Sequence, residues 1–155
     1  MPTSYKKADL FHLPSTTPRV EKFINMIMVS GKKNIAREIF TTTLKEIGAN
    51  GHTNPMLVWE TAIENASPNL MVKSKRVGGA VYAIPLEVKG EKKFFYAVKW
   101  IVEAARKAKG KPMHKKLAKE LLESYTNQWY AIKKKDDAHR MAEANKANAH
   151  FAKYI

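Results

Sequence analysis

Hydrophobic residues recur at helical spacing in six separate segments of the chain. In each segment they fall three or four positions apart, which places them on one face of a helix. Pro18 and Pro55 each suit the first turn of a helix, and Gly31 stands where the first segment ends. The pattern predicts a mainly α protein, a six-helix bundle, with helices over about residues 18–30, 35–47, 55–66, 94–105, 117–125 and 138–149.

Between the third and fourth segments the pattern changes from helical spacing to alternation. Residues 70–89 are rich in Val, Ile and Tyr, and Gly78-Gly79 interrupts them near the middle. Two alternating runs around a Gly-Gly turn predict one extended β-hairpin, inserted between the third and fourth helices. A lone two-stranded hairpin is only marginally stable in water, so we expect this one to pack against the helices or a partner.

The length of 155 residues fits one domain with one core. Residues 1–16 show no periodicity and predict a flexible N-terminal arm, which leaves residues 17–155 as a single helical domain. The absence of cysteine excludes disulfides and thiolate metal sites. No apolar run approaches the ~20 residues that span a bilayer, and residues 1–11 lack the apolar core of a secretory signal. We expect an intracellular protein with no membrane contact.

The net charge of +14 is concentrated in one part of the chain. Residues 71–120 hold 14 of the 28 basic and 4 of the 14 acidic side chains, a net charge of +10. Such a concentration favours a polyanionic partner, because lysine and arginine bind nucleic-acid phosphates without reading the base sequence. For the hairpin lysines a second interpretation stays open, namely that they discourage edge pairing on an ordinary surface strand.

The sequence offers little for catalysis. His139 lies beside Asp136 and Asp137, but acidic residues are expected there if they begin the sixth helix, so we favour capping of the helix dipole. No two histidines have the spacing of a zinc helix. We therefore expect no enzyme activity, no metal and no cofactor.

The tryptophans differ in what their surroundings indicate. Trp59 falls in an apolar stripe and is expected in the core, and Trp100 is expected to pack as well. Trp129 and Tyr130 follow the fifth helix in a stretch that we interpret as a loop. Whether this pair stacks on RNA or docks on a protein stays open.

Several runs of the chain form recognisable motifs. The longer ones are residues 75–80 (KRVGGA), 100–107 (WIVEAARK), 133–137 (KKKDD) and 139–147 (HRMAEANKA). These runs resemble ribosomal protein seven of the small subunit, and the likeness extends from about Pro18 to His150. Gly31-Lys32-Lys33 matches an early helix junction of that family.

The resemblance implies a fold of six helices with an extended hairpin, as the periodicity predicts. It also implies binding to the 3′ major domain of small-subunit ribosomal RNA (rRNA), nucleation of the assembly of the subunit head, and a hairpin near the exit site for tRNA and mRNA, beside a neighbouring ribosomal protein. Charge pattern and resemblance together give the candidate rRNA- and mRNA-binding residues Lys32, Lys33, Lys73, Lys75, Arg76, Gly78, Gly79, Lys99, Arg106, Lys107, Lys109, Lys111, Lys133, Lys134, Lys135, Arg140 and Lys146.

The chain departs from the family pattern in two informative places. Its arm carries only Lys6 and Lys7, where bacterial members usually have an Arg-rich arm. Trp129-Tyr130 stand where the family usually has small, Gly-containing sequence. These departures suggest a divergent lineage, on a ribosome of the bacterial cytoplasm or of an organelle (mitochondrion or plastid). The alternative function is an architectural DNA-binding protein, which a net charge of +14 also suits.

Overall fold

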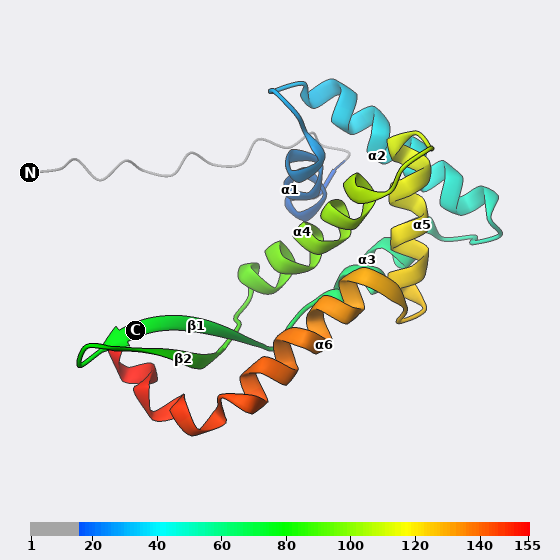
Figure 1. The fold of residues 1–155 in the computed structure, drawn as a ribbon. Coiled ribbons are helices and arrows are strands. Elements are labelled where there is room, and N and C mark those ends of the chain that lie inside the picture. The colour runs from blue at the N-terminus through cyan, green and yellow to red at the C-terminus, as the bar shows by residue number, and fades with distance from the viewer. Residues whose placement is uncertain (1–15) are drawn as a thin grey trace, which may run out of the picture.

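A computed structural model of the chain describes residues 16–155, so the predicted arm lies, except for Thr16, outside the described residues. Within them the order of elements matches the prediction, with the hairpin between the third and fourth helices (Figure 1). The elements are α1 (Pro18–Ile27), α2 (Lys33–Ala49), α3 (Pro55–Ala66), β1 (Leu70–Val77), β2 (Ala80–Glu87), α4 (Glu91–Lys107), α5 (Met113–Tyr125), α6 (Trp129–Ala144) and a 3-10 helix, η1 (Lys146–Tyr154).

Two of the helices begin as their sequences predict. The side-chain oxygen of Thr17 accepts a hydrogen bond from the backbone N–H of Val20, and that of Asn54 accepts one from Leu57, at 3.4 and 3.2 Å. A proline follows each of these residues at the first helical position, where its missing N–H costs no hydrogen bond.

The core forms around α5, which packs against α2, α3, α4 and α6. At its centre the ring of Trp59 meets Phe23, Phe40 and Phe94 with centroids 5.5, 5.9 and 6.5 Å apart, in edge-to-face arrangements. These four rings come from α1, α2, α3 and α4, so one aromatic cluster holds the first half of the bundle to the helix that follows the hairpin. The core positions predicted for Trp59 and Trp100 are confirmed, with exposed fractions of 2% and 7%.

The hairpin turns at the predicted glycines. Val77 pairs with Ala80, and Gly78 and Gly79 between them have φ values of +58° and +88°. A two-residue turn with two positive φ values matches the right-handed twist of the strands, and glycine adopts both values without steric cost. The ladder extends without a break from this tip to the pair of Leu70 with Glu87.

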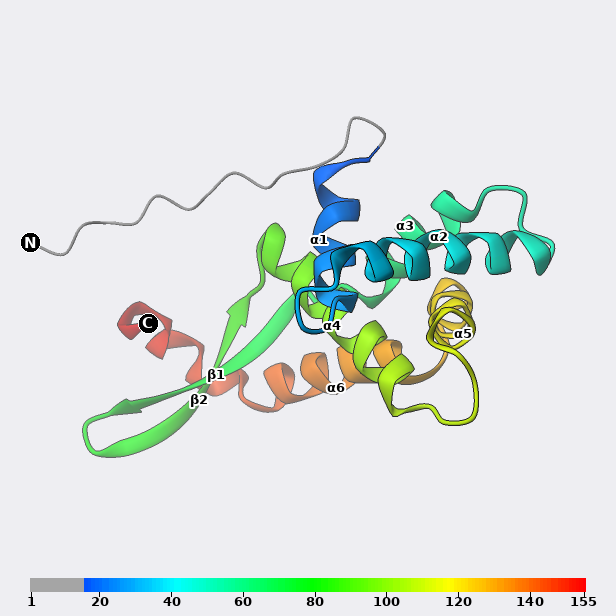
Figure 2. The same ribbon diagram turned by 90° about the horizontal axis from the view of Figure 1, so that it is seen from above.

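The hairpin projects from the bundle alongside α6 and η1 (Figures 1 and 2). Its most buried strand residue, Ile84, is fully buried yet lies outside the main core cluster. On the η1 side, Tyr82 stacks on Phe151 with centroids 4.5 Å apart, and the side-chain amide of Asn148 donates to the carbonyl of Ala83 at 3.0 Å. The expectation that the hairpin packs against helices is confirmed, and the helices are the last two of the chain.

The predicted bounds of the sixth helix are wrong. The helix begins at Trp129 rather than after the lysine run, and it ends at Ala144, where η1 takes over. Ala131 and Ile132 are buried in the main core, so the apolar face starts before residues 133–135, which occupy the continuing helix. The interpretation of Trp129 and Tyr130 as a loop is corrected by the same observation.

The predicted capping role of Asp136 and Asp137 fails for the same reason. Both residues lie in the middle of α6, whereas the dipole of a helix acts on charges within its first and last turns. Asp137 instead lies 3.4 Å from Arg140, one turn further along the helix.

A buried carboxylate fixes α1 against the start of α2. Glu21 is fully buried, and its carboxylate lies 3.2 Å from the ammonium of Lys33 and 3.3 Å from the guanidinium of Arg37. The hydroxyl of Thr16 donates to it at 2.9 Å. Burial acts to raise the pKa of Glu21, but the hydrogen bonds from Thr16 and Lys33 and the two positive charges outweigh it, so the pKa lies below its usual 4.5.

We expect Glu21→Gln to lower the free energy of unfolding at pH 7 by about 2 kcal/mol, because it removes the charge that these groups stabilise. A lowered folded-state pKa contributes stability that is complete above the usual value and is lost as the pH falls through the folded value. Urea unfolding across pH 2–7 should therefore show wild type and variant converging in acid. Glu38→Gln, at an exposed carboxylate of α2, is the matched control. A constant difference between Glu21→Gln and wild type at every pH would contradict the prediction.

Candidate nucleic-acid interface

Tyr130 joins the basic residues of α4 to those of α6. The ammonium of Lys107 donates to the Tyr130 hydroxyl at 2.8 Å, and that hydroxyl donates to the carboxylate of Glu103 at 3.0 Å. Lys107 also lies 2.9 Å from Glu103. The ammonium of Lys134 lies 5.4 Å from the centroid of the Tyr130 ring, within the range of a cation–π contact. Tyr130 thus brings Lys107 of α4 and Lys134 of α6 together, although they are far apart in the sequence.

Within this cluster one positive charge is already balanced. The hydrogen bonds from Lys107 and Tyr130 lower the pKa of Glu103, and those to Tyr130 and Glu103 raise the pKa of Lys107. Both groups are therefore charged at neutral pH. Lys107 therefore holds α4 against α6, and the carboxylate of Glu103 balances its charge.

Arg106 stabilises the end of α1. Its guanidinium donates to the carbonyls of Met26 and Ile27 at 3.1 and 3.2 Å. The last carbonyls of a helix have no partner within the helix, and a positive charge there also complements the helix dipole. Part of the donor capacity of this candidate is therefore used inside the protein.

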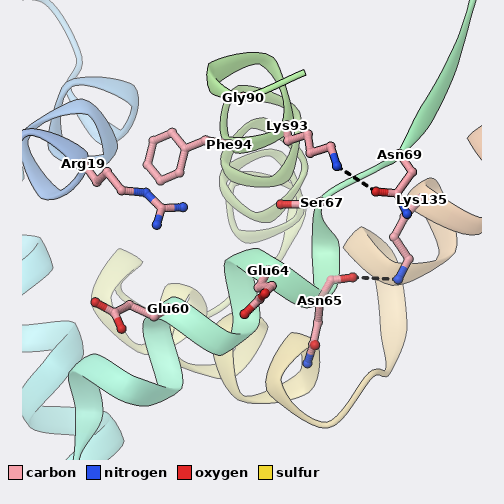
Figure 3. A pocket seen from close by; sticks show the side chains of 10 residues that line it. All are labelled: Arg19, Glu60, Glu64, Asn65, Ser67, Asn69, Gly90, Lys93, Phe94 and Lys135. Atoms are coloured by element: carbon pink, nitrogen blue, oxygen red, sulfur yellow. Dashed lines mark hydrogen bonds between the residues drawn. The ribbon is translucent and has the colours of Figure 1, made fainter. Parts of the chain in front are cut away.

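Lys135 likewise points inward, as Figure 3 shows. Its ammonium donates to the carbonyl of Asn65 at 2.7 Å, and the side chain of Asn65 donates to the carbonyls of Ser124 and Tyr125. The end of α3 is thereby tied to both α5 and α6. Lys135 is a structural residue in this arrangement, unlike the two lysines that precede it.

Three more candidates have acidic neighbours. Lys33 pairs with the buried Glu21, Arg140 lies 3.4 Å from Asp137, and Lys146 lies 3.6 Å from Glu143. The last two pairs are largely exposed, where an ion pair contributes little and yields readily to a phosphate. In the first pair, that of Lys33 with Glu21, the carboxylate is fully buried.

The remaining basic candidates have no hydrogen bond or ion pair to protein groups in the part of the chain that the structure describes. Most are exposed, and Lys75 is partly exposed. On the hairpin, Lys73 and Lys75 share one face, and Arg76 lies on the other, because side chains alternate along a strand. This group, which we call the free cations, consists of Lys32, Lys73, Lys75, Arg76, Lys99, Lys109, Lys111, Lys133 and Lys134.

Gly78 and Gly79 complete the hairpin tip. Both glycines are exposed, and a Cβ added at either would meet no atom within 4 Å. The backbone of the turn is thus accessible to a partner, as the sequence-based assignment of these two glycines requires.

The sequence analysis did not assign two cations beside a cavity of about 670 Å³ where α1, α3, α4 and α6 meet. In Figure 3 the guanidinium of Arg19 points into it, 5.0 Å from the ring centroid of Phe94, and Lys93 donates to the side chain of Asn69 at 2.9 Å. Glu60 and Glu64 line the same space, so its charges are mixed and do not favour a phosphate. No local motif signals this cavity, because its walls come from four helices.

His139 and Asp137, two of the residues considered above for catalysis, contact other parts of the protein. The ring Nε2 of His139 accepts a hydrogen bond from the backbone N–H of Asn69 at 2.9 Å, which ties α6 to the start of the hairpin. Asp137 faces Arg140, as described above. Over residues 16–155, no three histidine, aspartate or glutamate side chains gather closely enough to hold a metal ion. None of the helices in the same range is both long and apolar enough to cross a membrane.

The structure is that of a basic, mainly helical protein with free cations on several elements and a projecting, bare-tipped hairpin. Comparison with known proteins gives the family. The model of the family described as Ribosomal protein S7p/S5e matches residues 2–146. The chain belongs to this family of ribosomal proteins, and the resemblance seen in its sequence is confirmed.

Three relatives illustrate the similarity, and each is a small ribosomal subunit protein uS7. That of Natranaerobius thermophilus is 47% identical over 132 residues, 85% of both chains. That of Thermotoga neapolitana is 48% identical over 132 residues, again 85% of both. That of Halorhodospira halophila is 47% identical over 130 residues, 84% of this chain and 83% of the relative.

Lysines that hydrogen-bond within the fold, such as Lys135, should contribute more to stability than free cations such as Lys133. Lys135→Met removes the ammonium that donates a hydrogen bond to the carbonyl of Asn65. We expect this substitution to lower the free energy of unfolding by about 1–2 kcal/mol. Lys133→Met, two residues away on the same helix, is the matched control and should change it by less than about 0.5 kcal/mol. Urea unfolding at constant pH measures both. Equal effects of the two substitutions would contradict a structural role for Lys135.

Proposed function

We propose that this protein is a structural component of the small ribosomal subunit, that it binds the 3′ major domain of the rRNA, and that it nucleates assembly of the subunit head. The observation that carries the proposal is the set of free cations, none of which forms an ion pair with a carboxylate of the described chain. Membership of a ribosomal protein family supports rRNA as the polyanion that these cations bind. The relatives described above are bacterial, which favours a bacterial ribosome over an organellar one.

The free cations of the bundle suit a phosphate backbone better than a small ligand. They come from the α1–α2 junction (Lys32), from α4 and the loop after it (Lys99, Lys109 and Lys111), and from α6 (Lys133 and Lys134). Such a spread fits a folded RNA, whose phosphates meet a surface at many points, and each contact adds affinity by releasing counterions. Folded RNA is recognised largely through shape and backbone, so no single base-reading motif is required.

The hairpin is proposed to lie near the exit site for tRNA and mRNA, beside a neighbouring ribosomal protein. Three features support this. The hairpin projects from the bundle (Figure 2). Its tip carries no side chains at Gly78 and Gly79, and cations lie on both of its faces. A narrow projection of this kind reaches between other components, and bare glycines allow a close approach of backbone to backbone.

The alternative, an architectural DNA-binding protein, draws on the same charge. Free cations alone do not separate duplex DNA from folded RNA, since both present phosphates. Family membership favours RNA, and competition between the two polymers is the direct test. A preference for duplex DNA over the rRNA domain would reverse the proposal.

We expect the simultaneous change of Lys73, Lys75 and Arg76 to alanine to weaken binding to a 3′ major-domain rRNA fragment. Removing one cation from a phosphate should reduce the slope of log K against log salt by roughly one unit, so the slope should flatten by up to about three. Filter binding or fluorescence anisotropy between 50 and 300 mM salt gives the slope.

The control replaces three basic side chains outside the proposed interface, Lys22, Lys45 and Lys92, and removes the same net charge. It should change the slope by less than about one unit. Equal slopes for wild type and the hairpin variant would remove the hairpin from the rRNA interface. Binding that does not depend on salt would overturn the proposed function as a whole.

A further inference from the structure

Trp129 is the tryptophan that the core does not use. Its side chain is 68% exposed, whereas Trp59 and Trp100 are 2% and 7% exposed. It is absent from the main core cluster, while Ala131 and Ile132, two and three residues later, belong to it. Exposing so large an apolar side chain forgoes the burial that stabilises the other two.

The backbone at Trp129 is also in an unfavourable conformation. Its φ is +68°, in the left-handed region, where a bulky side chain is strained and glycine is not. Asn127 has a positive φ of +56° in the same short connection from α5, but asparagine tolerates that region. The chain thus carries at residue 129 a side chain that costs stability and adds nothing to the core. Strain of this kind is typical of positions that serve a function.

The surroundings of Trp129 indicate the chemistry of a partner. Lys133 lies four residues further along α6, about one helical turn, and belongs to the free cations. Lys134 follows it, over the ring of Tyr130. Within residues 129–135 there is no acidic side chain. An exposed aromatic side chain with an exposed, unpaired ammonium, that of Lys133, about one helical turn away suits an unpaired nucleotide, whose base stacks on the ring while a phosphate meets the lysine.

We propose that Trp129 is a stacking platform for an unpaired base of the rRNA, and that Lys133 binds the phosphate of that nucleotide or its neighbour. The inference rests on the proposed function and adds one site to it. Stacking is tolerant of base identity, so the platform selects an unpaired, extruded base rather than a particular sequence.

Two measurements test the site together. In acrylamide quenching of tryptophan fluorescence, Trp129 supplies the accessible fraction and the two buried tryptophans supply the protected background. Adding the 3′ major-domain fragment should remove most of the accessible fraction. In parallel, Trp129→Gly should bind the fragment about 10-fold more weakly, within the range expected when a base–aromatic stack is removed. The same variant should melt at a higher temperature, because glycine relieves the strained φ.

Matched variants separate stacking from other effects. Trp129→Tyr keeps an aromatic face and should retain most of the affinity. Phe95→Ala removes another exposed aromatic side chain, 48% exposed on α4, and should leave the affinity unchanged. Lys133→Met should weaken binding and flatten the salt slope by about one unit, as expected for one phosphate contact.

The outcomes are distinguishable. If the fragment binds with its salt dependence intact but Trp129→Gly binds as wild type, or Trp129 stays quenchable, the platform is overturned and the proposed function stands. If Trp129 is protected only in the complete subunit, its partner is a protein and the platform is again overturned. If the fragment does not bind the wild-type protein at all, both proposals fail. Protection together with weakened binding of Trp129→Gly supports the platform.

Discussion

A two-stranded ladder is only marginally stable in water, and the projecting half of this molecule depends on how that constraint is met. Here the ladder packs on the last two helices of the chain. Ile84 is buried away from the main core, Tyr82 stacks on Phe151, and His139 accepts the backbone N–H of Asn69 at the base of the hairpin. The C-terminal segment therefore allows the hairpin to extend beyond the bundle (Figure 1).

Internal contacts divide the basic residues into two classes. Some hold helices together: Lys33 on Glu21, Arg106 on the end of α1, and Lys135 on the end of α3. The free cations have no hydrogen bond or ion pair to protein groups within the described residues, and their like charges repel one another. The high net charge is tolerated because the fold-holding cations are paired internally, while the free ones are distributed over several elements.

The sequence predicted the fold well where a regular pattern met a clear boundary. The first five helices and the hairpin have strong periodicity, and glycine or proline follows each of the first four helices within a few residues, so local rules sufficed. The start of α6 was missed because the lysine run at residues 133–135 conceals an apolar face that begins at Ala131 and Ile132. Asp136 and Asp137 were then placed at a helix start where they do not lie. The candidate residues were chosen by charge, and charge does not tell whether a lysine points outward or toward a carbonyl.

The sequence by itself determined the class of fold, the basic character, the Gly-Gly turn and the family, because these are properties of residue order and composition. Only the tertiary structure decided which cations are free, since Lys133 and Lys135 differ solely in the direction of their side chains from one helix. It also decided that Tyr130 packs between α4 and α6 while Trp129 beside it stays exposed. Such distinctions arise from contacts between segments far apart in the chain, and no local pattern encodes them.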